Sequence, residues 1–392
     1  MHPPGADVVL VRHGDVSTKS PTVKRYMEGT LVENLEALLA DRSVPGEVER
    51  QWNRPLIHTT EDAVAEATET AADAFGVVSA SAALAVTPEK DAICAALVET
   101  ARACYDGGSF AIDAHRAEKD LPFTSRDIAI EGGDAIRAAV EAEFEPEVDL
   151  DDPDCTFGVE VREEAAYVYL ETVPGPGGLP LGTQAPMVAL ISGGIDSPVA
   201  AYEIMKRGSP VIPVYVDLGD YGGPDHEARA METVRTLSRY APNVDMRVYR
   251  VPGGETVALL AKTMEQGRML SLRRFFFEVA EHVAAAVGAA GIVTGEALGQ
   301  KSSQTARNFD VTSRATTLPI HRPLLTWDKQ EIVARAREIG TFADSTIPAG
   351  CNRVAPDRAE TNGRLEPLLE VEPDELAARA EEAAANATLV DP

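Results

Sequence analysis

The stretch that decides the fold is Met187-Val-Ala-Leu-Ile-Ser-Gly-Gly-Ile-Asp-Ser-Pro-Val-Ala-Ala-Tyr202. Its first five residues are apolar and predict a buried strand, whereas Pro198 fits the first turn of a helix that begins at Ser197. Between them lies Ser192–Ser197, where glycines allow unusual backbone angles and close approach to a ligand, and serines supply hydroxyl donors. A helix N-terminus directs unpaired N–H groups and a positive dipole at an anion. We therefore predict a phosphate-binding loop at a strand–helix junction.

The chain around this loop alternates between strand and helix patterns. Strands are predicted at 187–191, 211–216, 244–251 and 291–294, and helices at 197–207, 225–240, 270–287 and 328–339. Apolar strands separated by helices are typical of an α/β fold with a parallel, doubly wound sheet. A glycine- and proline-rich stretch, 174–182, precedes this region and predicts a domain boundary.

The N-terminal half has a different pattern. A strand is predicted at 8–11 and a helix at 22–39, followed by helices at 60–74 and 88–104 and strands at 109–114, 156–162 and 165–170. This mixture favours small α+β domains. The C-terminal end is acidic and rich in alanine, and we expect it to be helical at most and peripheral.

The composition is that of a soluble protein with more than one domain. The chain has 392 residues, of which 44% are hydrophobic and 25% charged. It shows neither an apolar run of the ~20 residues that a membrane span needs nor an export signal, so we expect a cytoplasmic location. The cysteines at 94, 104, 155 and 351 include no C-x-x-C pair, which argues against a zinc site or a disulfide framework.

The net charge of −27 is unusual for a protein that binds nucleic acid. One interpretation is that the protein has no such partner. The other, which we favour, is a halophilic protein in a very salty cytoplasm, where charges are screened within about 3 Å at molar salt. Positive charge gathers at two places, which are either solvated turns or RNA-facing edges. The candidate RNA-binding residues are Arg12, Lys19, Lys24, Arg25, Arg116 and Lys119.

The loop Ser192–Ser197 matches neither the Walker A pattern nor a G-x-G-x-x-G fingerprint. It resembles the pyrophosphate loop, or PP-loop, of adenylating ATP pyrophosphatases, which cleave ATP between the α and β phosphates. Such chemistry needs the charge of the departing pyrophosphate neutralised, usually by Mg²⁺ held by a carboxylate and by a positioned lysine. Asp196 and Lys329 are the candidates for these roles, although Asp196 alone is also compatible with a helix cap.

Two later motifs narrow the resemblance. Gly295-Glu-Ala-Leu-Gly-Gln-Lys-Ser-Ser-Gln-Thr305 and Pro319-Ile-His-Arg-Pro-Leu-Leu-Thr-Trp-Asp-Lys329 resemble the second and third signatures of tRNA 4-thiouridine synthetases, the ThiI family of tRNA sulfurtransferases. Leu10–Lys19 is similar to the opening of the same family, so the resemblance covers nearly the whole chain. It implies a ferredoxin-like domain at 1–55, an RNA-binding THUMP domain at 56–173, a linker at 174–184, a PP-loop ATP pyrophosphatase domain at 185–350 and a C-terminal segment, 351–392, with the catalytic cysteine and an acidic tail.

The resemblance also implies a reaction. ATP activates the C4 oxygen of the uridine at tRNA position 8 as an adenylate, and sulfur then replaces that oxygen. The implied partners are ATP, Mg²⁺ carried by ATP, tRNA and a second copy of the chain. Arg273 has an alternative as a charge on a helix surface. The implied ATP contacts are Ala189, Leu190, Ser192, Gly193, Gly194, Asp196, Ser197, Tyr215, Val216, Arg273, Gly295 and Gln304.

The third catalytic candidate is Cys351, because the family carries its sulfur-handling cysteine at this place. A thiolate can hold a persulfide and attack an activated carbon. An inert, buried thiol is the alternative, which we assign to Cys94, Cys104 and Cys155. Because the chain has no room for a rhodanese-like domain after Cys351 and no C-x-x-C for a cluster, we expect sulfide, or a persulfide donated by a cysteine desulfurase or carrier in trans. A role in thiamine synthesis stays open.

Two other functions are compatible with the same loop. An amidating synthetase would adenylate a carboxylate or a nucleobase, but the sequence shows no N-terminal catalytic cysteine for a glutaminase. An RNA-binding module with a non-catalytic ATP site is the second alternative. The presence of Asp196, Lys329 and Cys351 together favours catalysis.

Overall fold

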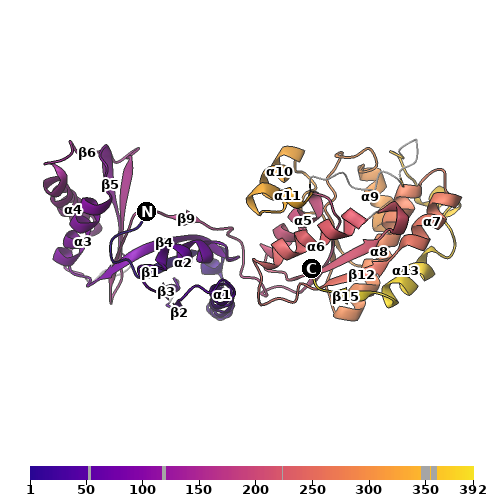
Figure 1. The fold of residues 1–392 in the computed structure, drawn as a ribbon, viewed down its shortest axis with the longest axis horizontal. Helices are drawn as coiled ribbons and strands as arrows, with labels where there is room; N and C mark the ends of the chain where they lie inside the picture. The colour runs from indigo at the N-terminus through magenta and orange to yellow at the C-terminus, as the bar shows by residue number, and fades with distance from the viewer. Residues whose placement is uncertain (52–53, 117–120, 223, 346–353, 355–359) are drawn as a thin grey trace. The chain divides into compact units, whose positions relative to one another are not determined.

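The computed structural model describes residues 1–51, 54–116, 121–222, 224–345, 354 and 360–392. The chain divides into two compact units, Met1–Pro180 and Leu181–Pro392, which Figure 1 shows as indigo-to-magenta and magenta-to-yellow ribbons. In the described part of the chain, no helix is both long and apolar enough to cross a membrane.

The first unit is built on one mixed sheet. Its strands run in the order β2-β3-β1-β4-β8-β7-β5-β6, and β9 pairs with β4. The strands are β1 (Val8–His13), β2 (Glu47–Glu49), β3 (Leu56–His58), β4 (Val77–Val86), β5 (Ser109–Arg116), β6 (Glu147–Val148), β7 (Cys155–Val161), β8 (Ala166–Tyr169) and β9 (Val173–Pro174). The helices are η1 (Asp15–Thr18), α1 (Pro21–Asp41), α2 (Val64–Ala72), α3 (Lys90–Cys104) and α4 (Ser125–Val140).

Strand β4 joins the two halves of this sheet, because it pairs antiparallel with β1 on one side and with β8 on the other. Our sequence interpretation named no strand here, since Val77–Val86 is rich in alanine and serine and lacks a clear alternation. It also named no helix at α4, which begins with a capping box between Thr124 and Asp127. The first unit is therefore one continuous sheet with two helical layers, α1 with α2 and α3 with α4.

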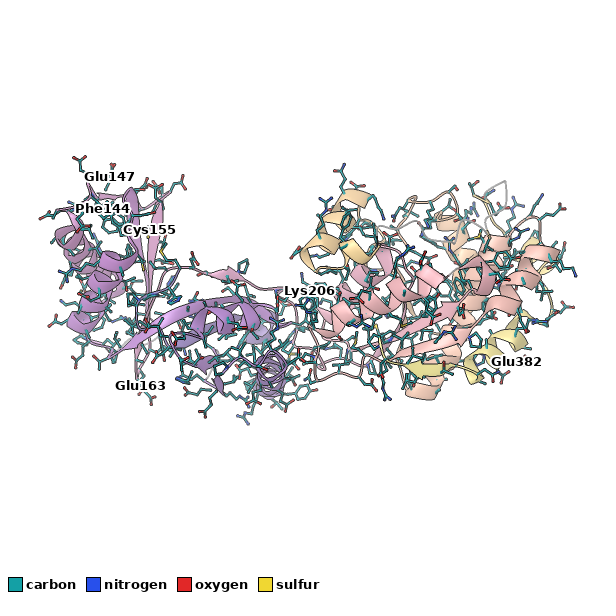
Figure 2. The ribbon with its side chains drawn as sticks, in the orientation of Figure 1. Phe144, Glu147, Cys155, Glu163, Lys206 and Glu382 are labelled. Carbon is teal, nitrogen blue, oxygen red and sulfur yellow. The ribbon has the colours of Figure 1, made fainter. Side chains whose placement is uncertain are left out.

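Acidic side chains are exposed on both units. Glu147 and Glu163 on the first unit and Glu382 on the second are exposed and point outward, as Figure 2 shows. Cys155 and Phe144 instead pack at the apolar cluster under α3 and α4. Much of the excess negative charge thus lies where water and ions reach it.

The second unit is an α/β domain whose sheet has the order β14-β13-β10-β11-β12-β15. The strands are β10 (Met187–Leu190), β11 (Val211–Asp217), β12 (Val248–Pro252), β13 (Ile292–Val293), β14 (Ile320–His321) and β15 (Thr388–Val390). All neighbouring pairs are parallel except β12 with β15. The helices are α5 (Asp196–Met205), η2 (Gly219–Tyr221), α6 (Pro224–Ser238), α7 (Gly254–Thr263), α8 (Arg268–Val287), α9 (Ala306–Ser313), α10 (Lys329–Glu338), α11 (Phe342–Ser345), α12 (Leu365–Leu369) and α13 (Leu376–Ala385).

Both faces of this sheet are covered, as a doubly wound fold requires. Val188 and Val214 belong to the large apolar core that includes α7, α8 and α13. Successive strand residues point to opposite faces, so the neighbouring Ala189 and Tyr215 lie on the other side, where the Tyr215 hydroxyl contacts His226 of α6. The predicted α/β class is confirmed.

The C-terminal end is not peripheral, so that expectation was wrong. Leu376, Ala380 and Ala383 of α13 are buried in the core against α8, and β15 closes the edge of the sheet on β12. These apolar residues are spaced so that they lie on one helical face, and alanine is small enough for close packing. Abundant glutamate on the opposite face hid this pattern.

Candidate nucleotide-binding site

The loop between β10 and α5 is closed by its own serines. The Ser192 N–H donates to Ser197 Oγ at 2.9 Å, the two serine Oγ atoms lie 3.2 Å apart, and the Gly194 N–H donates to Ser192 Oγ at 3.3 Å. Helix α5 begins at Asp196, inside the loop, so its first N–H groups face the same opening. The predicted strand–loop–helix junction is confirmed.

The glycines of the site are needed for a reason that differs from our expectation. Among the described residues, the glycines with positive φ do not include Gly193 or Gly194, so the unusual angles predicted for them were wrong. Instead, a Cβ on Gly193 would lie 2.9 Å from the carbonyl oxygen of His226. A Cβ on Gly295 would lie 2.7 Å from both the Asp196 carbonyl carbon and the Ser197 nitrogen. The absence of side chains therefore lets three backbone segments meet.

A pocket opens between this loop, the ends of β10 and β11, helix α8 and the segment after β13. Part of its wall is apolar and formed by Val216, Leu218, Met269, Leu272, Phe276 and Phe277. Of the candidate ATP contacts, the pocket is lined by Leu190, Ser192, Asp196, Ser197, Val216, Arg273, Gly295 and Gln304. Ala189, Gly193, Gly194 and Tyr215 are not among its lining residues. Such a pocket at the carboxyl ends of parallel strands is where α/β sheets bind ligands.

The two catalytic candidates within the described residues lie in contact. Lys329, the first residue of α10, places Nζ 2.6 Å from Asp196 Oδ1, and Gln300 Nε2 donates to the same carboxylate at 3.2 and 3.3 Å. A capping box between Asp328 and Glu331 fixes the start of α10 and thus the position of Lys329. Cys351, the third candidate, lies outside the described residues.

Arg273 is held at the pocket from two directions. Its Nη1 donates to the Ser303 carbonyl at 3.0 Å and its Nη2 to Ser303 Oγ at 3.2 Å, while its Nε lies 3.3 Å from Glu296 Oε1. Arg322 donates to the other oxygen of Glu296 at 2.9 Å. Burial lowers the pKa of Arg273, because its charge is poorly solvated, and an anionic ligand would offset that cost.

His226 and Glu296 are pocket residues that we did not select from the sequence. The Tyr215 hydroxyl and His226 Nδ1 are 3.1 Å apart, and burial, followed by nearby Arg229, lowers the pKa of His226. A lone histidine on a helix gives no sequence signal that its side chain lines a pocket. Glu296 lies inside the motif Gly295–Thr305, so the motif was the signal that could have found it.

The candidate RNA-binding residues lie in different environments. Lys19 and Arg25 are exposed, whereas Lys24 is buried with Nζ 3.9 Å from Glu28. Arg116 is half-buried and donates to backbone carbonyls of Leu121 and Phe123. Lys119 lies outside the described residues.

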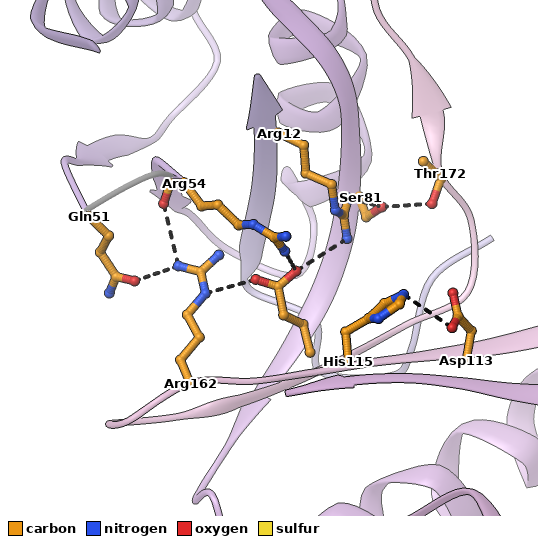
Figure 3. Close-up of polar contacts among 9 residues, drawn as sticks. Arg12, Gln51, Arg54, Ser81, Asp113, His115, Arg162 and Thr172 are labelled. Atoms are coloured by element: carbon orange, nitrogen blue, oxygen red, sulfur yellow. Dashed lines mark hydrogen bonds and ion pairs between the residues drawn. The ribbon is translucent and has the colours of Figure 1, made fainter. Parts of the chain in front are cut away.

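Arg12 belongs to a cluster around the buried Glu160, drawn in Figure 3. Arg54 forms an ion pair with this carboxylate, Arg162 Nε donates to it at 3.0 Å, and Arg12 Nη2 lies 3.8 Å away. The Arg12 guanidinium also lies over the ring of Tyr169, 4.8 Å from its centroid. The cluster connects β1 and the segment before β3 to β7 and β8, which indicates that Arg12 stabilises the sheet.

The cysteines of the first unit are half-buried, so the expectation that Cys94, Cys104 and Cys155 are buried was wrong. Burial raises the pKa of the Cys94, Cys104 and Cys155 thiols, which disfavours the reactive thiolate. Within the part of the chain that the structure describes, no group of three or more His, Cys, Asp or Glu side chains has the geometry to hold a metal ion.

The doubly wound sheet, the Ser-Gly-Gly-Ile-Asp-Ser loop and the pocket at the strand ends define a PP-loop ATP pyrophosphatase domain. Models of three families match the chain: the ThiI ferredoxin-like domain at residues 8–81, the THUMP domain at 89–171 and the thiamine biosynthesis protein (ThiI) at 182–375.

Individual similar proteins indicate the family more specifically than the family models do. A probable tRNA sulfurtransferase of Halobacterium salinarum is 59% identical over 96% of this chain and 95% of its own length. A probable tRNA sulfurtransferase of Methanosarcina acetivorans is 41% identical over 92% of this chain and 87% of its own length. A crystal structure of a 4-thiouridine synthetase–RNA complex with bound ATP matches with a TM-score of 0.84, at 29% identity, over 98% of this chain and 99% of that one. The chain belongs to the tRNA sulfurtransferase family.

Proposed function

We propose that this protein is an ATP-dependent tRNA sulfurtransferase that makes 4-thiouridine at tRNA position 8. The observation that carries the proposal is the Asp196–Lys329 pair, which lies at the edge of a pyrophosphate loop that opens on a partly apolar pocket. The chain also belongs to a family whose relatives are named for this activity, and it resembles a synthetase solved with both RNA and ATP.

In the first step, the C4 oxygen of the uridine attacks the α-phosphorus of ATP. The new O4–P bond forms as the bond to the β-phosphate breaks; pyrophosphate leaves, and the N3 proton is lost as the N3–C4 double bond forms. In this proposal, the N–H groups at the start of α5 and the serines of the loop hold the departing pyrophosphate. The Lys329 ammonium, which contacts Asp196 of the loop, neutralises its charge.

The remaining contacts orient the nucleotide. Arg273 supplies a fixed, poorly solvated positive charge for a phosphate, while Leu190 and Val216 supply apolar contacts for adenine. The Asp196 carboxylate, a hard oxygen donor that lines the pocket, would hold the Mg²⁺ carried by ATP, and the ion would neutralise phosphate charge.

In the second step, sulfur attacks C4, the C4–S bond forms, and AMP leaves with its oxygen. If the sulfur is the outer atom of a Cys351 persulfide, loaded in trans, an external thiol then reduces the S–S bond and releases the thiolated tRNA. If the donor is sulfide, no reduction is needed. Val354, three residues along the chain from Cys351, lines the pocket.

The tRNA is the proposed macromolecular partner. The exposed side chains of Lys19 and Arg25 are available for phosphate contacts, which would position the RNA without reading its sequence. We also propose a homodimer, which sedimentation of the purified protein would test.

The reaction is tested with unmodified tRNA, ATP, Mg²⁺ and sulfide, or with a cysteine desulfurase and cysteine. We expect AMP formation that depends on tRNA, together with 4-thiouridine in the recovered RNA. Cys351→Ala is expected to abolish thiolation with the persulfide donor while leaving ATP binding intact. AMP formation that does not depend on tRNA, or incorporation of nitrogen from ammonia instead of sulfur, would refute the proposal.

A further inference from the structure

Asn308, in helix α9, lies at the junction of two segments. Its side chain is fully buried. Its Nδ2 donates to the carbonyl oxygens of Ser303, at 2.9 Å, and Glu360, at 2.7 Å, and its Oδ1 accepts from the Gly363 N–H at 2.9 Å. A buried amide with these partners is costly to remove, because each partner would lose its hydrogen bond.

One of these partners, Ser303, contacts a residue that lines the nucleotide pocket. The Ser303 carbonyl that accepts from Asn308 also accepts from Arg273, and Ser303 Oγ accepts from the same guanidinium. The next residue, Gln304, lines the pocket. Asn308 therefore contacts, through Ser303, the arginine that is proposed to bind the ATP phosphates.

The other partners belong to the chain that follows Cys351. Glu360 and Gly363 bond to Asn308 itself, and Thr305 Oγ1 donates to the Thr361 carbonyl at 2.9 Å. A Cβ on Gly363 would lie 2.9 Å from Asn308 Oδ1 and 2.5 Å from Leu270 Cδ1, so alanine at this position would force these side chains to shift. Helix α9 and its N-cap Thr305, which follows the pocket-lining Gln304, therefore hold this segment.

A second bond reaches the same chain nearer to Cys351. Arg268, at the start of α8, donates from Nη1 to the carbonyl of Val354 at 3.2 Å. The neighbouring Met269 lines the pocket, as does Val354 itself. The segment is thus bonded at two points, to α9 through Asn308 and to the pocket-lining helix α8 through Arg268.

We propose that Asn308 is a positioning residue that links the adenylation pocket, through Ser303 and Arg273, to the segment that follows Cys351. The inference rests on the proposed function. The link holds residues 360–363, which follow Cys351 in the sequence, next to the contacts of Arg273, and thereby favours attack on the adenylated uridine by the persulfide over attack by water. Water would otherwise attack C4, release AMP and restore uridine without thiolation.

The test is the ratio of AMP released to 4-thiouridine formed. The full chain is assayed with unmodified tRNA, ATP, Mg²⁺, a cysteine desulfurase with cysteine, and dithiothreitol as the reducing thiol. For Asn308→Ala the ratio is expected to rise at least about fivefold over wild type, because hydrogen bonds to both segments are lost. The matched control is Thr312→Val on the same helix, whose buried hydroxyl donates to the carbonyl of Phe309 at 3.5 Å and which should keep the wild-type ratio.

The outcomes separate the inference from the function on which it rests. A wild-type ratio in Asn308→Ala, including the case in which AMP and 4-thiouridine fall together, overturns the inference. If Cys351→Ala, the expected upper limit, also keeps the wild-type ratio, the cysteine assignment fails and the inference fails with it. Wild-type protein without tRNA-dependent AMP refutes the proposed function itself. Should Asn308→Ala not fold, Gly363→Ala tests the same contact from the other side and should raise the ratio.

Discussion

Glu278 of α8 gives the most quantitative prediction. Its side chain is only 14% exposed, with Arg274 at 3.9 Å. Burial raises its pKa from 4.5 to about 7; Arg274 opposes this effect, and the carboxylates of Glu372 and Glu281 add to it. A carboxyl with a higher pKa in the folded state binds its proton more tightly when folded, so its contribution to stability is lost as pH rises from about 4.5 to about 7. At about 1.4 kcal/mol for each pKa unit, this loss is at most about 3.5 kcal/mol.

Glu278→Gln removes the titrating group while keeping nearly the same shape. We expect the variant to be about 1–3 kcal/mol more stable than wild type at pH 8 and equally stable near pH 4.5, in urea unfolding at constant salt. Glu281→Gln is the control. Although burial alone would raise the pKa of Glu281, hydrogen bonds from Thr317 lower it, so this variant should lose stability at pH 8. Equal stability of Glu278→Gln and wild type at pH 8 would refute the reasoning.

Three further predictions follow from the packing and the charges. Gly295→Ala should weaken ATP binding by at least about tenfold in calorimetry, because the new Cβ would lie 2.7 Å from backbone atoms of Asp196 and Ser197. The control is Gly133→Ala, where the new Cβ has no heavy atom within 4 Å, and equal affinities of the Gly295→Ala and Gly133→Ala variants would contradict the contact. Glu160→Gln should lower the unfolding free energy of the first unit by about 3–5 kcal/mol, because it leaves Arg12, Arg54 and Arg162 without their carboxylate; an unchanged denaturation midpoint would show that the cluster is unimportant. At a net charge of −27, transfer from molar KCl to dilute buffer should destabilise the fold, and full stability there, measured by circular dichroism, would argue against the halophilic interpretation.

The sequence was sufficient for the parts of the fold with strong local patterns. The loop Ser192–Ser197 and the alternating elements of the second unit carry their own turn chemistry and periodicity. Strand β4 and helix α13 were missed or misjudged because small alanines are buried there by tertiary packing rather than by a local apolar pattern. Domain limits and RNA contacts stay predictions.

The candidate site, like the fold, was only partly predictable from the sequence. The family resemblance identified Arg273, Gly295 and Gln304, which line the pocket. The contacts that hold Arg273 come from Ser303 and Glu296, and Arg322 in turn contacts Glu296. These partners are brought to Arg273 by tertiary folding, so no fixed sequence spacing from Arg273 predicts them. In the same way, the requirement for Gly193 became clear only from the nearby carbonyl of His226.

The most direct test of the central claim is the 4-thiouridine content of tRNA, measured by mass spectrometry of nucleosides from a deletion strain. The account predicts that deletion removes 4-thiouridine, and that the wild-type gene restores it whereas Asp196→Asn and Cys351→Ala do not. Unchanged 4-thiouridine in the deletion strain would contradict the proposed function. Full restoration by Cys351→Ala would contradict the role of this cysteine in sulfur transfer.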